Sequence, residues 1–190
     1  MNKRFKMNFE RDNVKRVRTS GQIIPLTRNQ GFTLVEMVVV LSILGIAVAI
    51  AMPSFIRFVQ NNRLATTANA FVGALNLARS EAITRGVTVT VCKSPDQIDC
   101  VANGDWAQGW IVFMDPDNDG EVADADDILR VYDGLPAPST FVGTANVSNR
   151  VSYAPTGFPA VLSSGTVALT IGGRTINVVL NTTGRVRTDR

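Results

Sequence analysis

The stretch RNQGFTLVEMVVV, from Arg28 to Val40, leads into the most apolar part of the chain. The 25 residues from Phe32 to Ile56 contain one ionisable side chain, that of Glu36. At about 1.5 Å per residue, a helix of this length measures about 37 Å, which is enough to cross a bilayer with some tilt. A carboxylate inside such a span costs about 2.5–3.5 kcal/mol, and less near the interface. Glu36 therefore needs either a position at headgroup level or a partner.

The flanks of the apolar stretch predict its orientation. Residues 1–31 hold eight basic and two acidic side chains, so their net charge is +8 − 2 = +6. By the positive-inside rule, the N-terminus is cytoplasmic and the rest of the chain lies across the membrane. The far end of the stretch, around Pro53, lacks the small-residue cleavage pattern of a secretory signal. We therefore expect a single-pass inner-membrane protein with a periplasmic C-terminal domain.

Composition argues against an enzyme. The 190 residues include no histidine, which removes the commonest general base, the histidine-activated nucleophiles and histidine zinc sites. Cys92 and Cys100 lie eight positions apart and could form a disulfide or contribute to a zinc site. With no further ligands nearby, the disulfide is the better interpretation, and it indicates an oxidising compartment such as a periplasm.

Charge is distributed unevenly beyond the apolar stretch. Residues 96–133 carry eleven acidic side chains and one basic side chain, Arg130. Residues 134–190 carry five arginines and one acidic side chain, Asp189. Such a separation of charge concerns the partners of a protein rather than its fold.

The periodicity of the apolar residues predicts an α+β fold. After Pro53 they follow a 4-3-4-3-4 spacing typical of a helix packed on a sheet: Leu64, Ala68, Phe71, Leu75, Ala78 and Ala82. Beyond Gly86 the pattern changes to strands, beginning near residues 87, 109, 127, 150, 166 and 174, the last two joined by Gly172-Gly173. We expect a long N-terminal helix, half transmembrane and half amphipathic, packed on an antiparallel β-sheet domain.

An acidic loop matches part of a calcium-binding pattern. Asp115, Asp117, Asp119 and Glu121 take the first, third, fifth and seventh positions of an EF-hand loop, and Asp126 takes the twelfth. Alternate carboxylates of this kind converge on a hard cation. Predicted strands rather than helices flank the loop, so the alternative is a solvated acidic turn.

The hexapeptide Gly31-Phe32-Thr33-Leu34-Val35-Glu36 resembles the prepilin peptidase site of the type IV pilin superfamily. The resemblance implies cleavage after Gly31, N-methylation of Phe32 and a helix kink at Pro53. It also implies that Glu36 pairs with the Phe32 ammonium of a neighbouring subunit. A leader of thirty-one residues is long for this family, and a start at Met7 would shorten it to twenty-five.

Three further segments are similar to the FimT/GspH branch of minor pilins and pseudopilins. They are ARSEAITRG from Ala78, the strand VTVTVC from Val87, and WAQGWIVFMDPDNDG from Trp106. The expected organisation is a removed leader (1–31), a transmembrane stem (32–54), an amphipathic helix (55–86), a β-sheet domain (87–183) and a basic tail (184–190). The expected partners are other pilin or pseudopilin subunits, prepilin peptidase and the inner membrane.

The C-terminus separates the two functions that this resemblance implies. Gly184-Arg185-Val186-Arg187 resembles a GRxR motif of FimT-type pilins, which that family links to DNA capture in natural transformation. In an extended tail Arg185 and Arg187 point to one side, about 6.6 Å apart, and Arg190 adds a third cation for double-stranded DNA. The main interpretation is a DNA-binding minor pilin, and the alternative is an H-type pseudopilin of type II secretion. The tail could also be a solubilising end or pair with the acidic loop.

Overall fold

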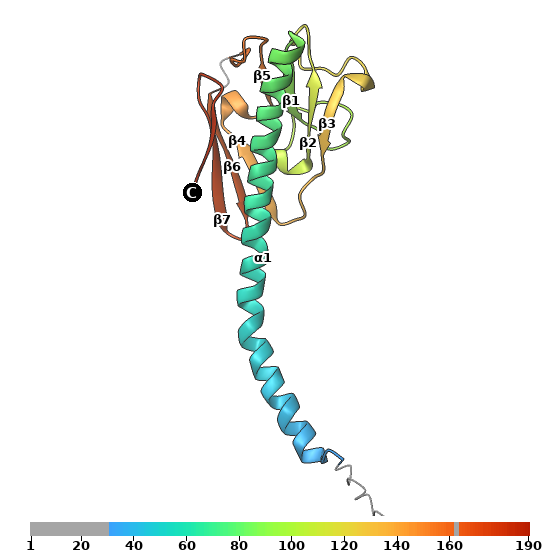
Figure 1. The fold of residues 1–190 in the computed structure, drawn as a ribbon, viewed down its shortest axis with the longest axis vertical. Coiled ribbons are helices and arrows are strands. Elements are labelled where there is room, and N and C mark those ends of the chain that lie inside the picture. The colour runs from blue at the N-terminus through green and yellow to red at the C-terminus, as the bar shows by residue number, and fades with distance from the viewer. Residues whose placement is uncertain (1–30, 162–163) are drawn as a thin grey trace, which may run out of the picture. The chain divides into compact units, whose positions relative to one another are not determined.

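A computed structural model describes residues 31–161 and 164–190, so the predicted leader lies outside the described residues except for Gly31. Figure 1 shows one long helix and a set of antiparallel strands. The chain divides into two units, residues 1–43 and 44–190. What is described of the first unit is the start of the helix. The second unit holds the rest of that helix and every strand in the described part of the chain.

Helix α1 spans Leu34–Arg85 and has 52 residues. It begins after Thr33, whose side-chain hydroxyl accepts a hydrogen bond from the backbone N–H of Glu36 at 3.2 Å. It ends at Gly86, which adopts a φ of 70° and donates its N–H to the carbonyl of Ala82 at 3.0 Å. Helical structure continues through Pro53, although proline lacks the N–H that would bond one turn back. The kink at Pro53 stays a prediction.

The first sheet has the strand order β3-β2-β1-β5, with every neighbouring pair antiparallel. Its strands are β1 (Val89–Lys93), β2 (Trp110–Met114), β3 (Ile128–Tyr132) and β5 (Arg150–Tyr153). All four lie where residue alternation predicts strands.

The second sheet has the order β4-β6-β7-β8 and is also antiparallel. Its strands are β4 (Ser139–Gly143), β6 (Gly165–Ile171), β7 (Arg174–Leu180) and β8 (Val186–Asp189). Strands β6 and β7 form the predicted hairpin. Gly172 and Gly173 at its tip have φ values of 60° and 75°, which a two-residue turn of this kind requires.

The core lies where α1 meets both sheets. The predicted stripe of α1 is buried, with Ala74 added to it: Leu64, Ala68, Phe71, Ala74, Leu75, Ala78 and Ala82. Phe71 makes edge-to-face contacts with Trp106, Trp110 of β2 and Phe141 of β4, at ring-centroid distances of 5.0, 5.5 and 4.8 Å. This one side chain therefore joins the helix to both sheets. The antiparallel α+β fold predicted from the sequence is confirmed.

The C-terminal segment differs from the expected free tail, because residues 186–189 form the edge strand β8. A turn at Asn181–Gly184 reverses the chain. The side-chain oxygen of Asn181 accepts hydrogen bonds from the N–H groups of Thr183 at 3.1 Å and Arg185 at 2.8 Å. Gly184, at a φ of 77°, donates its N–H to the Asn181 carbonyl at 3.0 Å. Gly184 thus turns the chain back along β7 rather than away from it.

Candidate functional site

The residues of the predicted cleavage and assembly site lie at the start of α1. Phe32 is 75% exposed, and Glu36 is exposed one helical turn further on. Thr33, between them, caps the helix, a role that we did not predict. The pattern Thr-x-x-Glu at residues 33–36 is the sequence signal of such a cap. Cleavage after Gly31 would leave this cap intact, with the new α-amino group beside the first turn.

The apolar half of α1 is left uncovered by the other residues that the structure describes. The large hydrophobic side chains of this segment, from Phe32 to Phe58, are exposed, with values such as 74% for Ile50 and 60% for Phe58. Within the described residues, α1 is the one helix that is long and apolar enough to cross a membrane. An apolar surface of this extent requires a bilayer or other subunits around it.

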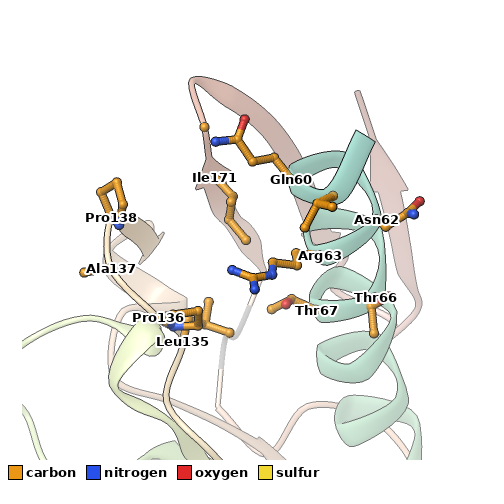
Figure 2. A pocket seen from close by; sticks show the side chains of 12 residues that line it. Gln60, Asn62, Arg63, Thr66, Thr67, Leu135, Pro136, Ala137, Pro138 and Ile171 are labelled. Carbon is orange, nitrogen blue, oxygen red and sulfur yellow. The ribbon is translucent and has the colours of Figure 1, made fainter. Parts of the chain in front are cut away.

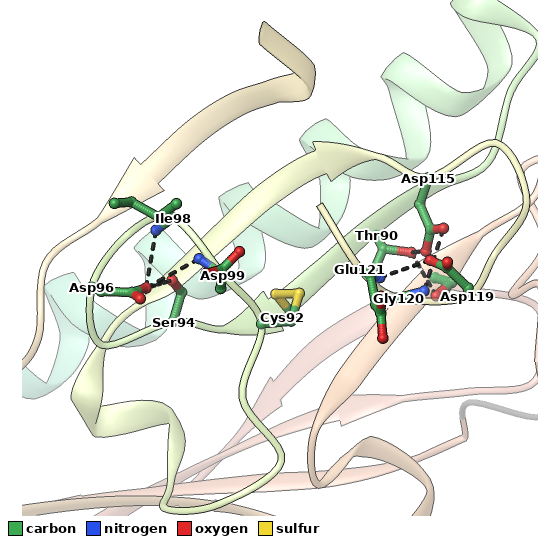
Figure 3. The surroundings of a disulfide bond; sticks show 12 residues. Thr90, Cys92, Ser94, Asp96, Ile98, Asp99, Asp115, Asp119, Gly120 and Glu121 are labelled. Atoms are coloured by element: carbon green, nitrogen blue, oxygen red, sulfur yellow. Dashed lines mark hydrogen bonds between the residues drawn. A yellow bond between two sulfur atoms is a disulfide. The ribbon is translucent and has the colours of Figure 1, made fainter. Parts of the chain in front are cut away.

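The two cysteines form a disulfide between the end of β1 and the following loop. Cys92 and Cys100 have a Cα–Cα distance of 5.6 Å (Figure 3). Cys92 packs with Ile111 and Phe113 on the face of the first sheet that points away from α1. The predicted disulfide is confirmed, and with no free cysteine in the described part of the chain the zinc alternative lacks its ligands.

The loop between β1 and β2, part of which the disulfide closes, is also held by a buried lysine. Lys93 is 1% exposed, and its ammonium donates hydrogen bonds to the carbonyls of Ala102 at 2.8 Å and Gly104 at 3.0 Å. It donates a third to the side-chain oxygen of Asn149 at 3.0 Å. Burial lowers the pKa of Lys93, and the nearby Asp105 carboxylate opposes that shift. This network gives the loop a structural role.

The acidic loop brings together three of its five predicted ligands. Carboxylate oxygens of Asp115, Asp117 and Asp119 all lie within 4.8 Å of one another. Asp115 is buried and accepts hydrogen bonds from the Thr90 hydroxyl at 2.7 Å and the Gly120 N–H at 3.4 Å (Figure 3). These oxygens are of the kind that calcium prefers.

The other two predicted ligands lie outside this cluster. Among the described residues, neither Glu121 nor Asp126 belongs to the group of converging carboxylates. Asp126 instead lies in a 3-10 turn, where its N–H bonds to Asp124. The guanidinium of Arg150 already lies beside the loop and donates to the Asn118 carbonyl at 3.3 Å. The cluster therefore fits a hard cation only in part, and calcium binding stays a prediction.

Strand β8 divides the three C-terminal arginines between its two sides. Arg187 lies opposite Val179 and Asp189 opposite Asn177, while Val186 packs against the core. Because side chains alternate along a strand, Arg187 and Asp189 share the outer face of the second sheet. Arg190 instead lines a hollow near α1 with Arg174. Within residues 31–161 and 164–190, no ion pair joins these arginines to the acidic loop, so the structure gives that alternative no support.

Gly184 has a structural role in the predicted GRxR motif. It is buried, and its carbonyl accepts a hydrogen bond from the Tyr153 hydroxyl at 3.3 Å. Burial raises the pKa of Tyr153, so this hydroxyl remains a donor throughout the physiological range. Gly184 therefore anchors the last turn to β5, while Arg185 next to it stays exposed.

Comparison with known families and structures agrees with the resemblance. The family model "Type II transport protein GspH" matches residues 67–184, more than half of the chain, and the "Prokaryotic N-terminal methylation motif" matches residues 26–52. No curated protein matches the chain.

Two solved structures are similar in fold. The type IV minor pilin FimU of Pseudomonas aeruginosa is 20% identical over 70% of this chain and 92% of its own, with a TM-score of 0.56. The minor pseudopilin EpsH of the Vibrio cholerae type 2 secretion system is 15% identical over 66% of this chain and 94% of its own, with a TM-score of 0.46. FimU thus supports the pilin-like fold, and the functional assignment depends on the family models.

These families consist of structural subunits rather than enzymes, and membership implies other pilin subunits and prepilin peptidase as partners. The motif and the exposed apolar helix are consistent with an inner-membrane prepilin that assembles into a filament. The chain belongs to the GspH family, and it is a minor pilin or pseudopilin of a type IV pilus or type II secretion system.

Proposed function

We propose that the chain is an H-type pseudopilin, a subunit of the periplasmic pseudopilus that drives type II protein secretion. One observation carries the proposal: the GspH model covers residues 67–184, which include most of the domain packed around Phe71. In this proposal prepilin peptidase cuts between Gly31 and Phe32 on the cytoplasmic side of the inner membrane. The mature subunit then waits in the membrane, with its domain in the periplasm.

Glu36 would act when the subunit joins the filament. Cleavage creates an α-amino group at Phe32, four residues before Glu36. A carboxylate in low dielectric is costly alone, and an opposite charge offsets that cost when the two meet. Pairing Glu36 with the Phe32 ammonium of a neighbour would therefore fix the register between subunits. N-methylation of Phe32 leaves that nitrogen positively charged.

A minor pilin that binds DNA is the second candidate. The exposed Arg185 and Arg187 favour it, because they form no hydrogen bond through their side chains and no ion pair within the described residues. Against it, Asp189 shares their face, and the chain from Phe32 onward has eleven basic and fourteen acidic side chains, a net charge of 11 − 14 = −3. Two phosphate contacts would give a slope of log affinity against log salt of about −1.8.

Deletion of the gene in its host distinguishes the two candidates. For a pseudopilin we expect secreted proteins to accumulate in the periplasm, with DNA uptake unchanged. Complementation with Arg185→Gln and Arg187→Gln should restore secretion fully. The DNA-binding pilin would instead be established if the deletion abolished DNA uptake and left secretion normal, and if the double variant failed to restore DNA uptake.

A further inference from the structure

A groove runs between α1 and the loop Leu135–Pro138, with a volume of about 520 Å³. Its walls are largely apolar, with Val59 on the helix, Leu135 on the loop and Ile171 at the end of β6. Figure 2 shows the side chain of Arg63 extending from α1 into this groove. The groove therefore combines apolar walls with one cation.

Arg63 has no anionic partner in the described part of the chain. The side chain is exposed and forms neither an ion pair nor a hydrogen bond within residues 31–161 and 164–190. Its helix also offers none nearby, because no acidic residue occurs between Glu36 and Glu81. A ligand for this groove should therefore carry a negative charge next to apolar groups.

The position of the groove along α1 indicates where that ligand comes from. Val59 and Thr67, at its two ends on the helix, follow the apolar stretch that stops at Ile56 by three and eleven residues. At the helical rise, these positions lie about 4.5 and 16.5 Å beyond the stretch. Bilayer headgroups occupy about 5–7 Å on each side of the hydrocarbon. The lower end of the groove thus reaches headgroup level.

Three more arginines surround the same end of the domain. Arg57 directly follows the apolar stretch, and Arg174 and Arg190 line a second hollow with Leu64 of α1. The two hollows adjoin through the β6–β7 hairpin, where Gly172 lines the groove and lies against Gln60. We name these four residues, Arg57, Arg63, Arg174 and Arg190, the basic collar.

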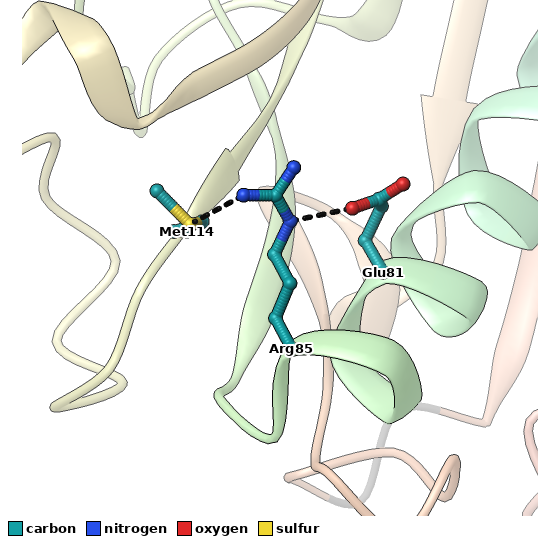
Figure 4. A network of polar contacts seen from close by, with 3 residues as sticks. All are labelled: Glu81, Arg85 and Met114. Carbon is teal, nitrogen blue, oxygen red and sulfur yellow. Dashed lines mark hydrogen bonds and ion pairs between the residues drawn. The ribbon is translucent and has the colours of Figure 1, made fainter.

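The acidic loop lies at the opposite end of the domain. At the C-terminal end of α1, Arg85 pairs with Glu81 and donates a hydrogen bond to the Met114 sulfur at 3.5 Å (Figure 4). Asp115 directly follows Met114, so the acidic cluster begins beside this end of the helix. Gln60 and Arg85 are 25 residues apart, which is about 37 Å along a helix. The cluster of Asp115, Asp117 and Asp119 thus lies at the end of the domain away from the membrane segment, and the basic collar lies at the end near it. Two carboxylates also lie near the collar, Asp133 two residues before Leu135 and Asp189 next to Arg190.

We propose that the groove and the basic collar bind an anionic phospholipid of the membrane that α1 enters. The lipid would be raised partly out of the bilayer, so that its phosphate meets Arg63 about 10.5 Å beyond the apolar stretch. Its glycerol and upper acyl groups would lie against Val59 and Ile171, on the side of Arg63 nearer the membrane. The position of the groove directly beyond the apolar stretch supports a lipid over an acidic protein partner, because the headgroups of the bilayer are the anions nearest to Arg57 and Val59. The proposal rests on the membrane orientation given under the proposed function, and it concerns the subunit before assembly.

Native mass spectrometry of the full-length chain in detergent tests this proposal. Phosphatidylglycerol and phosphatidylcholine, matched in acyl chains, are added separately, and the lipid retained by the protein is titrated. We expect the wild type to retain phosphatidylglycerol preferentially. Arg63→Gln should weaken that binding by about fivefold, and adding Arg174→Gln should bring the loss to about thirtyfold. Arg63→Lys should keep most of the affinity.

Arg130→Gln is the matched control, because Arg130 lies on β3, outside the basic collar, and its loss changes the net charge equally. Equal retention of phosphatidylglycerol by the double variant and the wild type would overturn the proposal, as would no preference over phosphatidylcholine. Binding of an acidic partner subunit lost in the same variants, without lipid preference, would assign the groove to that subunit. Secretion assays fail or succeed independently of this measurement, so the two proposals are tested separately.

Discussion

The two halves of α1 belong to one continuous helix, but the first half exposes its apolar side chains and the second half buries them. Up to Phe58 its large apolar side chains are exposed, whereas between Leu64 and Ala82 seven side chains are buried against the sheets. The first half is not covered by any described part of the chain, so its apolar surface is available to a bilayer or to other subunits. The second half has its partners inside the chain. Substitutions in the first half should therefore change processing or assembly, and those in the second half should change stability.

The largest expected effect is a loss of cleavage just before the first half of α1. Gly31→Val should abolish cleavage, because the peptidase must approach the backbone closely at this position. A Cβ at Gly31 would meet no atom of the chain within 4 Å, so the fold should be unaffected. Immunoblotting with co-expressed prepilin peptidase should show only the precursor. A normally processed product would place the cleavage site elsewhere.

Phe71→Ala, in the second half of α1, should destabilise the folded domain. Removing a fully buried phenylalanine costs about 3–5 kcal/mol of unfolding free energy, and Phe71 contacts three aromatic side chains from both sheets. Chemical denaturation of the full-length chain in detergent measures the loss, with the exposed Asn69→Ala as control. Cleavage at Gly31 should proceed as in the wild type. A loss below about 1 kcal/mol would show that α1 does not organise this core.

Removing the disulfide at the end of β1, in the first sheet, should have a smaller effect on stability. Replacing both cysteines by Cys92→Ser and Cys100→Ser should lower the unfolding free energy by about 2–3 kcal/mol, since the disulfide closes a short loop. Non-reduced periplasmic protein should have a mass two hydrogens below that of the dithiol. Reductant should destabilise the wild type but not the double variant; two free thiols in the wild type would contradict the bond.

Calcium should have the smallest effect, and only on the domain. The cluster of Asp115, Asp117 and Asp119 lacks the predicted ligand at Asp126 and has Arg150 close by. At a calcium concentration equal to a millimolar dissociation constant, binding would stabilise by about 0.4 kcal/mol. Thermal unfolding with calcium against chelator measures this, with Asp117→Asn as the variant that should lose it. An identical shift in Asp117→Asn, or no shift and no heat in calorimetry, would show that the loop is a solvated turn.

The fold was largely predictable because its elements follow regular apolar patterns. The buried stripe from Leu64 to Ala82, the Gly172-Gly173 hairpin and the disulfide could all be identified from spacing. Strands β4 and β8 could not, since their residues lack clean alternation and β8 carries charged side chains on an edge. The position of β8 depends instead on the turn at Asn181, whose side chain accepts hydrogen bonds from Thr183 and Arg185. Those hydrogen bonds leave no apolar pattern in the sequence.

The candidate sites were predictable in chemistry more than in geometry. Sequence indicated that Arg185, Arg187 and Arg190 would act together, but pairing in β8 sends Arg190 to the side of Arg174. It likewise indicated five acidic ligands, of which three converge, because Asp126 enters a separate 3-10 turn. Contacts between distant segments, such as Gly172 with Gln60, leave no periodic signal in a sequence.

Incorporation of Glu36→Ala into filaments tests whether Glu36 pairs with the Phe32 ammonium of a neighbouring subunit. We expect this variant to be cleaved after Gly31 and to unfold with the same free energy as the wild type, because Glu36 is exposed and belongs to neither buried hydrophobic cluster. Purified pili or pseudopili should then lack the variant, because the Phe32 ammonium of the neighbour has lost its carboxylate. Incorporation at the wild-type level would contradict the pairing.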